Sequence, residues 1–177
     1  MTEPTELTDP PLAGDEAATL RGFLDYQRDV IRRKTEGLTQ EQLNRTLPPS
    51  TMTLGGLLKH LAIVEHSWFS QVFLGLDLAE PWGSVDWDAD ADWEWHSAAD
   101  DTPAYLRGLY DATIAESDRI LQAALAAGGL DLLSVREARA GGHYSVRWIV
   151  VHLIEEYARH AGHADLLREA IDGRTGD

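Results

Sequence analysis

Cysteine is absent from this chain of 177 residues. The protein can therefore form no disulfide, and it offers neither a thiolate metal ligand nor a cysteine nucleophile. Any thiol chemistry must use a thiol from another molecule. Positive charge is also scarce, because 15 Lys and Arg stand against 30 Asp and Glu, a formal net charge of −15. A field of this sign repels phosphate backbones and anionic lipid surfaces, so we expect no nucleic-acid partner and no membrane partner.

Long apolar runs and targeting signals are missing as well. No segment approaches the run of about 18 to 20 apolar residues that a transmembrane helix needs. Residues 1–14 have neither the basic nor the apolar region of a signal peptide, so we expect a cytoplasmic protein. The length suits one domain with a full hydrophobic core. We expect a flexible leader over residues 1–13 and a single domain over residues 14–172.

Apolar residues recur at steps of three and four in four long segments, which predicts four long helices. The segments span residues 15–37, 53–75, 102–128 and 145–171. Thr53, Thr102 and Ser145 precede three of them as N-caps, and glycines follow all four. Thr39 and Gln42 have the capping-box spacing of one more short turn. No strand pair is expected. The pattern predicts an all-α antiparallel bundle whose functional groups project into the core between facing helices.

A long connection over about residues 76–101, here called the acidic stretch, separates the second and third predicted helices. It holds nine Asp and Glu, no Lys or Arg, and four of the six Trp. Because it shows no sustained helical or strand period, we predict a loop whose Trp side chains pack on the bundle. Asp86, Asp88, Asp90 and Asp92 alternate as in a calcium loop, but the Gly and Glu that such a loop needs at its sixth and twelfth positions are missing. We therefore predict no calcium site.

Three polar residues interrupt the apolar faces of the second and fourth predicted helices. Glu156 and His160 stand one turn apart on the fourth helix, and His60 lies among Leu and Val on the second. A buried carboxylate is costly unless it is paired or binds a cation, and Glu and His at i,i+4 can hold one ion together. Three N/O ligands from two helices leave a fourth position open, as in a catalytic zinc site. We therefore predict that His60, Glu156 and His160 bind a metal.

Each of these residues also has a purely structural interpretation. His60 can be a hydrogen-bonded core histidine, and Glu156 with His160 can be an exposed ion pair. Together, the three residues favour the metal site, because each buried polar group then satisfies the others.

Other polar residues near this site are weaker candidates. His152 and His163 share the face of the fourth helix, so they are candidates for hydrogen-bonding a metal ligand or for acid–base work. Arg159 and Arg147 are candidates for receiving a carboxylate of a thiol or substrate. Residues that lie off the two faces are expected to be mostly solvated: Glu65, His66, Glu155 and Arg159.

The motifs on these two helices resemble a known family. Leu-Leu-Lys-His-Leu at residues 57–61 and Glu-Tyr-Ala-Arg-His-Ala-Gly-His at residues 156–163 are similar to motifs of the DinB-like/YfiT-like metalloenzyme superfamily. Gly-Phe-Leu-Asp-Tyr-Gln at residues 22–27 is similar to its actinobacterial "mini-circle" branch, and the resemblance covers about residues 12–169.

The resemblance implies an up-down-down-up four-helix bundle that holds one divalent ion, usually zinc or nickel. Carried over by position, the metal ligands are His60, Glu156 and His160. The family more often has His where this chain has Glu156, although mycothiol-dependent maleylpyruvate isomerase, a relative, has a similar His, Glu, His set. Family members are often homodimers, so a homodimer is a further expectation.

The family also suggests a chemistry. Its better characterised members act with low-molecular-weight thiols such as mycothiol. Our leading hypothesis is an S-transferase in which the metal stabilises the thiolate of mycothiol, the cosubstrate, for attack on an electrophilic substrate. The alternatives are a metal-dependent hydrolase that uses a metal-bound water, a non-catalytic metal-binding stress-response protein, and a dimerising scaffold without metal. Dinucleotide, nucleoside-triphosphate and serine-hydrolase motifs are absent from the sequence.

Overall fold

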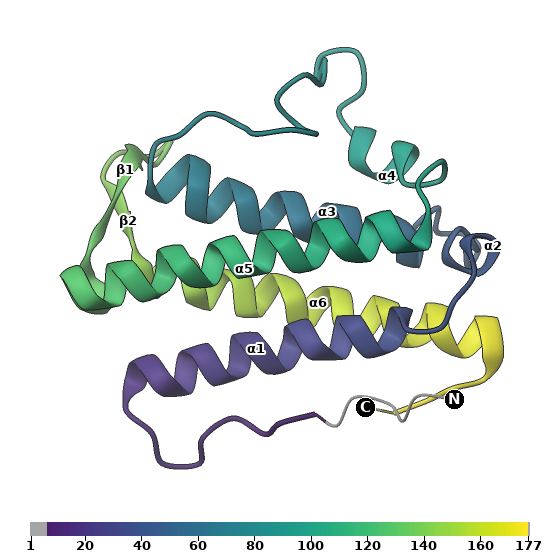
Figure 1. Cartoon of the computed structure of the whole chain (residues 1–177), viewed down its shortest axis with the longest axis horizontal. Helices are drawn as coiled ribbons and strands as arrows, with labels where there is room; N and C mark the ends of the chain where they lie inside the picture. The colour runs from purple at the N-terminus through teal and green to yellow at the C-terminus, as the bar shows by residue number, and fades with distance from the viewer. Residues whose placement is uncertain (1–6, 177) are drawn as a thin grey trace.

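The computed structural model describes residues 7–176 and consists mainly of helices (Figure 1). The α-helices of this part of the chain are α1 (Glu16–Thr35), α2 (Gln40–Leu43), α3 (Leu54–His66), α4 (Trp93–Ser97), α5 (Pro103–Ala127) and α6 (Val146–Asp172). Helix α3 continues into the π-helical segment η1 (Ser67–Phe73), and a 3-10 turn, η2 (Gly129–Asp131), follows α5. Of the predicted flexible leader, residues 1–6 lie outside the described residues, and residues 7–13 contain no helix or strand.

The helix starts follow the predicted capping residues. Thr53, Thr102 and Ser145 each accept a hydrogen bond from the backbone N–H three residues ahead. Thr39 and Gln42 form the predicted capping box at α2. Local hydrogen bonds that the sequence specifies therefore fix where three of the long helices begin.

The four long helices form an up-down-down-up bundle. In Figure 1, α1 and α6 run in one direction and α3 and α5 in the other. Helix α1 packs mainly on α6, α3 packs on α5, and α3 also contacts α6. The all-α four-helix bundle predicted from the sequence is thus confirmed. Among the described residues, no helix combines the length and apolar character that crossing a membrane requires.

A buried ion pair lies inside the bundle. The guanidinium of Arg28 on α1 makes two hydrogen bonds with the carboxylate of Glu65 on α3, at 2.7 and 2.9 Å, and both side chains are fully buried. Arg28 also contacts Asp25 and Asp118, and the hydroxyl of Tyr157 on α6 donates to Glu65 at 3.0 Å. The prediction that Glu65 is solvated is wrong, because its carboxylate joins three helices in the core.

A small hairpin corrects the expectation that the chain has no strand pair. Strand β1 (Leu133–Glu137) pairs antiparallel with β2 (His143–Ser145), and their register is irregular. Strands of five and three residues are too short to give a periodic signal. In addition, Ser145, which ends β2, is also the N-cap of α6. Gly141 and Gly142 adopt positive φ of 88° and 81° in the turn, which other residues rarely do.

The acidic stretch also departs from the prediction, because residues 93–97 form α4, which packs on α3. Lys59 of α3 donates to Ser97 at 2.8 Å and to Asp101 at 2.6 Å, and its ammonium lies 4.2 Å from the centre of the Trp93 ring. Gly56 of α3 permits close approach, since a Cβ there would lie 2.6 Å from a ring carbon of Trp95. A helix of one to two turns carries too little period to be recognised, and these tertiary contacts stabilise it.

The buried ion pair generates a stability prediction. Replacing Arg28 by Met leaves Glu65 charged, buried and short of its main partner, so the free energy of unfolding should fall by about 3–5 kcal/mol. Urea denaturation followed by circular dichroism measures this change. As a matched control, Arg119→Met breaks an exposed pair with Glu116 and should change stability little. Equal effects of the two substitutions would contradict the role assigned to Arg28.

Candidate metal centre

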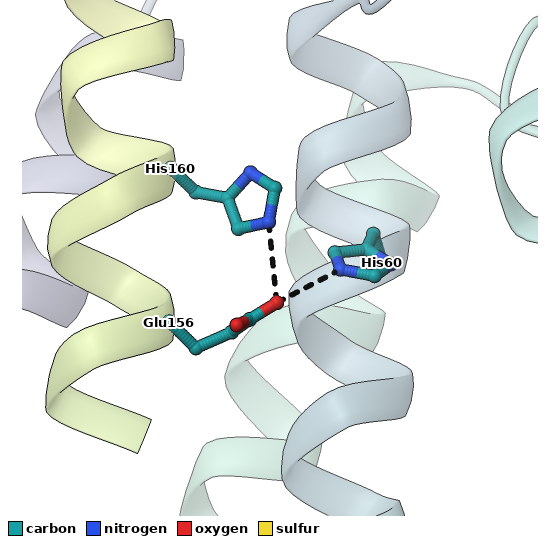
Figure 2. Close-up of side chains that lie close together, drawn as sticks. All are labelled: His60, Glu156 and His160. Atoms are coloured by element: carbon teal, nitrogen blue, oxygen red, sulfur yellow. Dashed lines mark ion pairs between the residues drawn. The ribbon is translucent and has the colours of Figure 1, made fainter. Parts of the chain in front are cut away.

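Side chains from two distant segments of the sequence, His60 on one and Glu156 and His160 on the other, converge between α3 and α6. Figure 2 shows His60 reaching from α3 towards Glu156 and His160, which stand one turn apart on α6. Oε1 of Glu156 lies 3.5 Å from Nε2 of His60 and 3.3 Å from Nε2 of His160. The three ligand atoms all lie within 4.8 Å of one another. The structure thus brings together the three residues that the sequence predicts as metal ligands.

The two distances from Glu156 suit a divalent cation. Two donor atoms bound to one tetrahedral zinc at about 2.0 to 2.2 Å lie about 3.3 to 3.6 Å apart. Both distances from Glu156 Oε1 to the imidazole nitrogens fall in this range. Two imidazoles and one carboxylate form a donor set that zinc and several other transition metals accept, with a fourth position left open. The residues present therefore fit a metal ion.

The electrostatics of the three residues favour the protonation states that bind a metal. Their side chains are 19, 16 and 8 % exposed for His60, Glu156 and His160. Burial opposes ionisation of Glu156, but His160, His60 and Arg159 outweigh it and hold the pKa of this carboxyl below its ordinary value. Burial, assisted by His60, lowers the pKa of His160 to about 4. At neutral pH Glu156 is therefore anionic and His160 neutral, as metal ligation requires.

The far side of His60 faces α4. Its Nδ1 lies 3.1 Å from Oε1 of Glu94, a buried carboxylate of the acidic stretch. The indole of Trp95 stacks on the imidazole, with ring centres 4.7 Å apart and planes inclined by 27°. The sequence does not predict either contact with His60. The acidic stretch holds nine acidic residues and four tryptophans, and no local pattern distinguishes Glu94 and Trp95 from the others.

The weaker candidates lie at different distances from the three ligands. His163 is adjacent, with its Nδ1 3.4 Å from Nδ1 of His160. Arg159 pairs with Glu155 at 2.7 Å, and its guanidinium lies 3.9 Å from Glu156. His152 lies one turn before Glu156 on α6, where its ring stacks on Trp148 and meets the edge of Trp68.

Two further residues have structural partners away from the three ligands. Arg147 forms ion pairs with Glu16 and Asp131 at the start of α6, so its charge is already compensated. His66, predicted to be solvated, is partly buried against the ring of Trp82 and accepts a hydrogen bond from the backbone N–H of Ala79. Burial lowers the pKa of His66. The prediction of a solvated His66 is therefore wrong.

The low pKa of His160 predicts a pH-dependent stability of the metal-free protein. The unfolded chain binds a proton at His160 near pH 6.5, whereas the folded chain resists it until the pKa of about 4. Stability contributed by neutral His160 is therefore present above pH 6.5 and is lost as the pH falls towards 4. In chelator, the drop in melting temperature from pH 7 to pH 5 should be smaller for His160→Gln than for the unchanged protein.

His96 provides a control of opposite sign. The Asp90 carboxylate raises the pKa of His96, which stabilises the folded state at low pH. The fall in melting temperature from pH 7 to pH 5 should therefore be the same in His96→Gln as in the unchanged protein, or slightly larger. A drop in His160→Gln equal to that of the unchanged protein would show that His160 is not held neutral by the fold.

Comparison with known proteins agrees with this geometry. The family model of mycothiol-S-transferases matches residues 19–173. No curated protein matches the chain. The matched region covers most of the chain and includes most of α1 and all of α3, α5 and α6, with His60, Glu156 and His160. The resemblance inferred from the sequence motifs is confirmed, and the chain belongs to the mycothiol-S-transferase family.

Proposed function

We propose that this chain is a metal-dependent mycothiol S-transferase whose metal ion is held by His60, Glu156 and His160. The observation that carries the proposal is the convergence of two imidazole nitrogens and one carboxylate oxygen within 4.8 Å, from two helices. The family supplies the class of reaction, a mycothiol-related transfer of sulfur. Zinc or nickel is the ion we propose, since both accept imidazole and carboxylate ligands.

Each ligand contributes a different property. Glu156 supplies a negative charge that offsets part of the charge of a divalent ion. His160 is neutral at neutral pH, so no proton has to leave it before ligation. His60 comes from the facing helix α3 and supplies the third ligand beside the two from α6. When bound, the cation would lower the pKa of a coordinated thiol, so that a thiolate exists near pH 7.

The chain itself has no sulfur nucleophile, because it contains no cysteine. The attacking sulfur therefore belongs to the cosubstrate, for which the family indicates mycothiol. In the transfer, this sulfur forms a bond to an electrophilic carbon of the second substrate, the leaving group departs with its electron pair, and the thiol proton passes to solvent. Arg159, whose side chain is more than half exposed beside Glu156, is placed to receive an anionic group of either substrate. A cytoplasmic location and a homodimer remain predictions.

The experiment compares neighbouring glutamates on α6. Glu156→Ala removes a ligand, whereas Glu155→Ala removes an equal charge that is 60 % exposed and bonded to Arg159. Zinc affinity is measured by competition with a chromophoric chelator. Glu156→Ala should weaken zinc binding by more than about 100-fold, because removing a ligand costs more than removing a hydrogen-bond partner of a ligand. Glu155→Ala should bind zinc as the unchanged protein does.

The same variants test the chemistry. The metal-loaded protein is mixed with mycothiol and monochlorobimane, and the fluorescent thioether is followed. We expect turnover that requires metal and mycothiol, is lost in Glu156→Ala and is retained in Glu155→Ala. Metal binding without turnover of several electrophiles would favour a non-catalytic metal-binding protein. Hydrolysis of an ester without thiol would favour the metal-bound water, and either result would contradict the S-transferase.

A further inference from the structure

The two nitrogens of the His60 imidazole face two different carboxylates. Nε2 points towards Glu156 at 3.5 Å, on the side of the proposed metal. Nδ1 faces Glu94 of α4 at 3.1 Å, the shorter of the two contacts and within hydrogen-bond distance. A neutral imidazole carries its proton on one nitrogen only, so the partner of Nδ1 decides whether Nε2 is free to bind a cation.

Glu94 is a costly residue for the fold to bury. Its side chain is 10 % exposed, and within the described part of the chain its Oε2 has no hydrogen-bond partner. A buried carboxylate with an unpaired oxygen destabilises a protein. Among the residues that the structure describes, the one polar partner of this carboxylate is His60, which contacts Oε1. The arrangement is therefore explained better by an action on His60 than by stability.

We propose that Glu94 is a positioning residue, whose carboxylate accepts the Nδ1–H of His60 and so keeps the lone pair of Nε2 directed at a metal ion shared with Glu156 and His160. This inference rests on the proposed metal site and adds a residue from outside the family motifs quoted above. Metal-binding histidines commonly donate their second N–H to a carboxylate, which fixes the tautomer and increases the basicity of the ligand nitrogen.

The contacts of α4 with α3 keep Glu94 in this position. Lys59, the neighbour of His60, bonds to Ser97 and Asp101 on either side of the end of α4. Trp95 covers the face of the imidazole, and Gly56 leaves room for the indole. His60 is thus held by a carboxylate at its Nδ1 edge and by an indole on its face, both from the acidic stretch.

Glu94 also changes the charge of the site. With Glu156, it places two carboxylates on opposite edges of one imidazole. Two anionic groups near two imidazoles favour a divalent cation over a monovalent one, because the charges of the carboxylates are then fully offset.

The first test measures zinc affinity with a chromophoric chelator. Glu94→Ala should weaken zinc binding by about 10–100-fold, the usual effect of removing a partner of a metal ligand. Glu94→Gln should weaken zinc binding less than Glu94→Ala does, since its amide oxygen still accepts the Nδ1–H and its shape preserves the packing of α4. Asp100→Ala removes an exposed charge of the same stretch and should bind zinc as the unchanged protein does. Circular dichroism checks that every variant is folded.

The second test needs no metal, so it separates this inference from the proposed function. In chelator at pH 8, the ¹⁵N chemical shifts of the His60 side chain report which nitrogen carries the proton. We expect Nδ1–H in the unchanged protein and in Glu94→Gln. In Glu94→Ala the proton should move to Nε2, where Glu156 accepts it.

The outcomes are distinguishable. If the unchanged protein binds no zinc, the proposed function fails, while the tautomer still decides the role of Glu94. The inference is overturned if His60 keeps the same tautomer in Glu94→Ala, or if zinc affinity falls no further in Glu94→Ala than in Asp100→Ala.

Discussion

The carboxylate of Glu156, held between two imidazoles from facing helices, is the interaction on which the proposed function depends. One oxygen atom lies 3.5 and 3.3 Å from the nitrogens of His60 and His160. The carboxylate therefore carries its negative charge in a largely buried environment, which is costly without a compensating positive charge. A cation that shared the three donors would offset that charge, and a fourth position left open on it would be the place for a substrate in the proposed reaction.

The rest of the bundle keeps α3 and α6 at the separation that this interaction requires. Glu65 lies further along α3 than His60, and Tyr157 is the residue after Glu156 on α6. The hydrogen bond between Tyr157 and Glu65 joins the two helices next to the candidate metal ligands. Arg28 of α1 compensates the charge of Glu65 in the core. The buried ion pair and the candidate metal ligands are thus neighbouring polar groups inside the bundle, and α4 contacts them at His60.

The sequence was sufficient for the parts of the structure that are encoded locally. Helix period and capping residues predicted the four long helices, and the i,i+4 spacing of Glu156 and His160 predicted that both face the core. The wrong predictions concern residues whose surroundings depend on segments that are distant in the sequence. The prediction of a solvated Glu65 is wrong, because nothing near this residue in the sequence shows that Arg28 lies opposite. No local pattern predicts the contact between Glu94 and His60, because it depends on the packing of α4 on α3, which Lys59 and Gly56 support through contacts with residues more than 30 positions away.

X-ray absorption at the zinc edge reports the atoms that surround the ion, so it tests whether His60, Glu156 and His160 bind it. For zinc-loaded protein, we predict two imidazoles and light oxygen donors at about 2.0 to 2.2 Å. Added mycothiol should replace one light donor by a sulfur at about 2.3 Å. A spectrum without imidazole contributions, or one that mycothiol leaves unchanged, would contradict a thiol-binding metal centre at His60, Glu156 and His160.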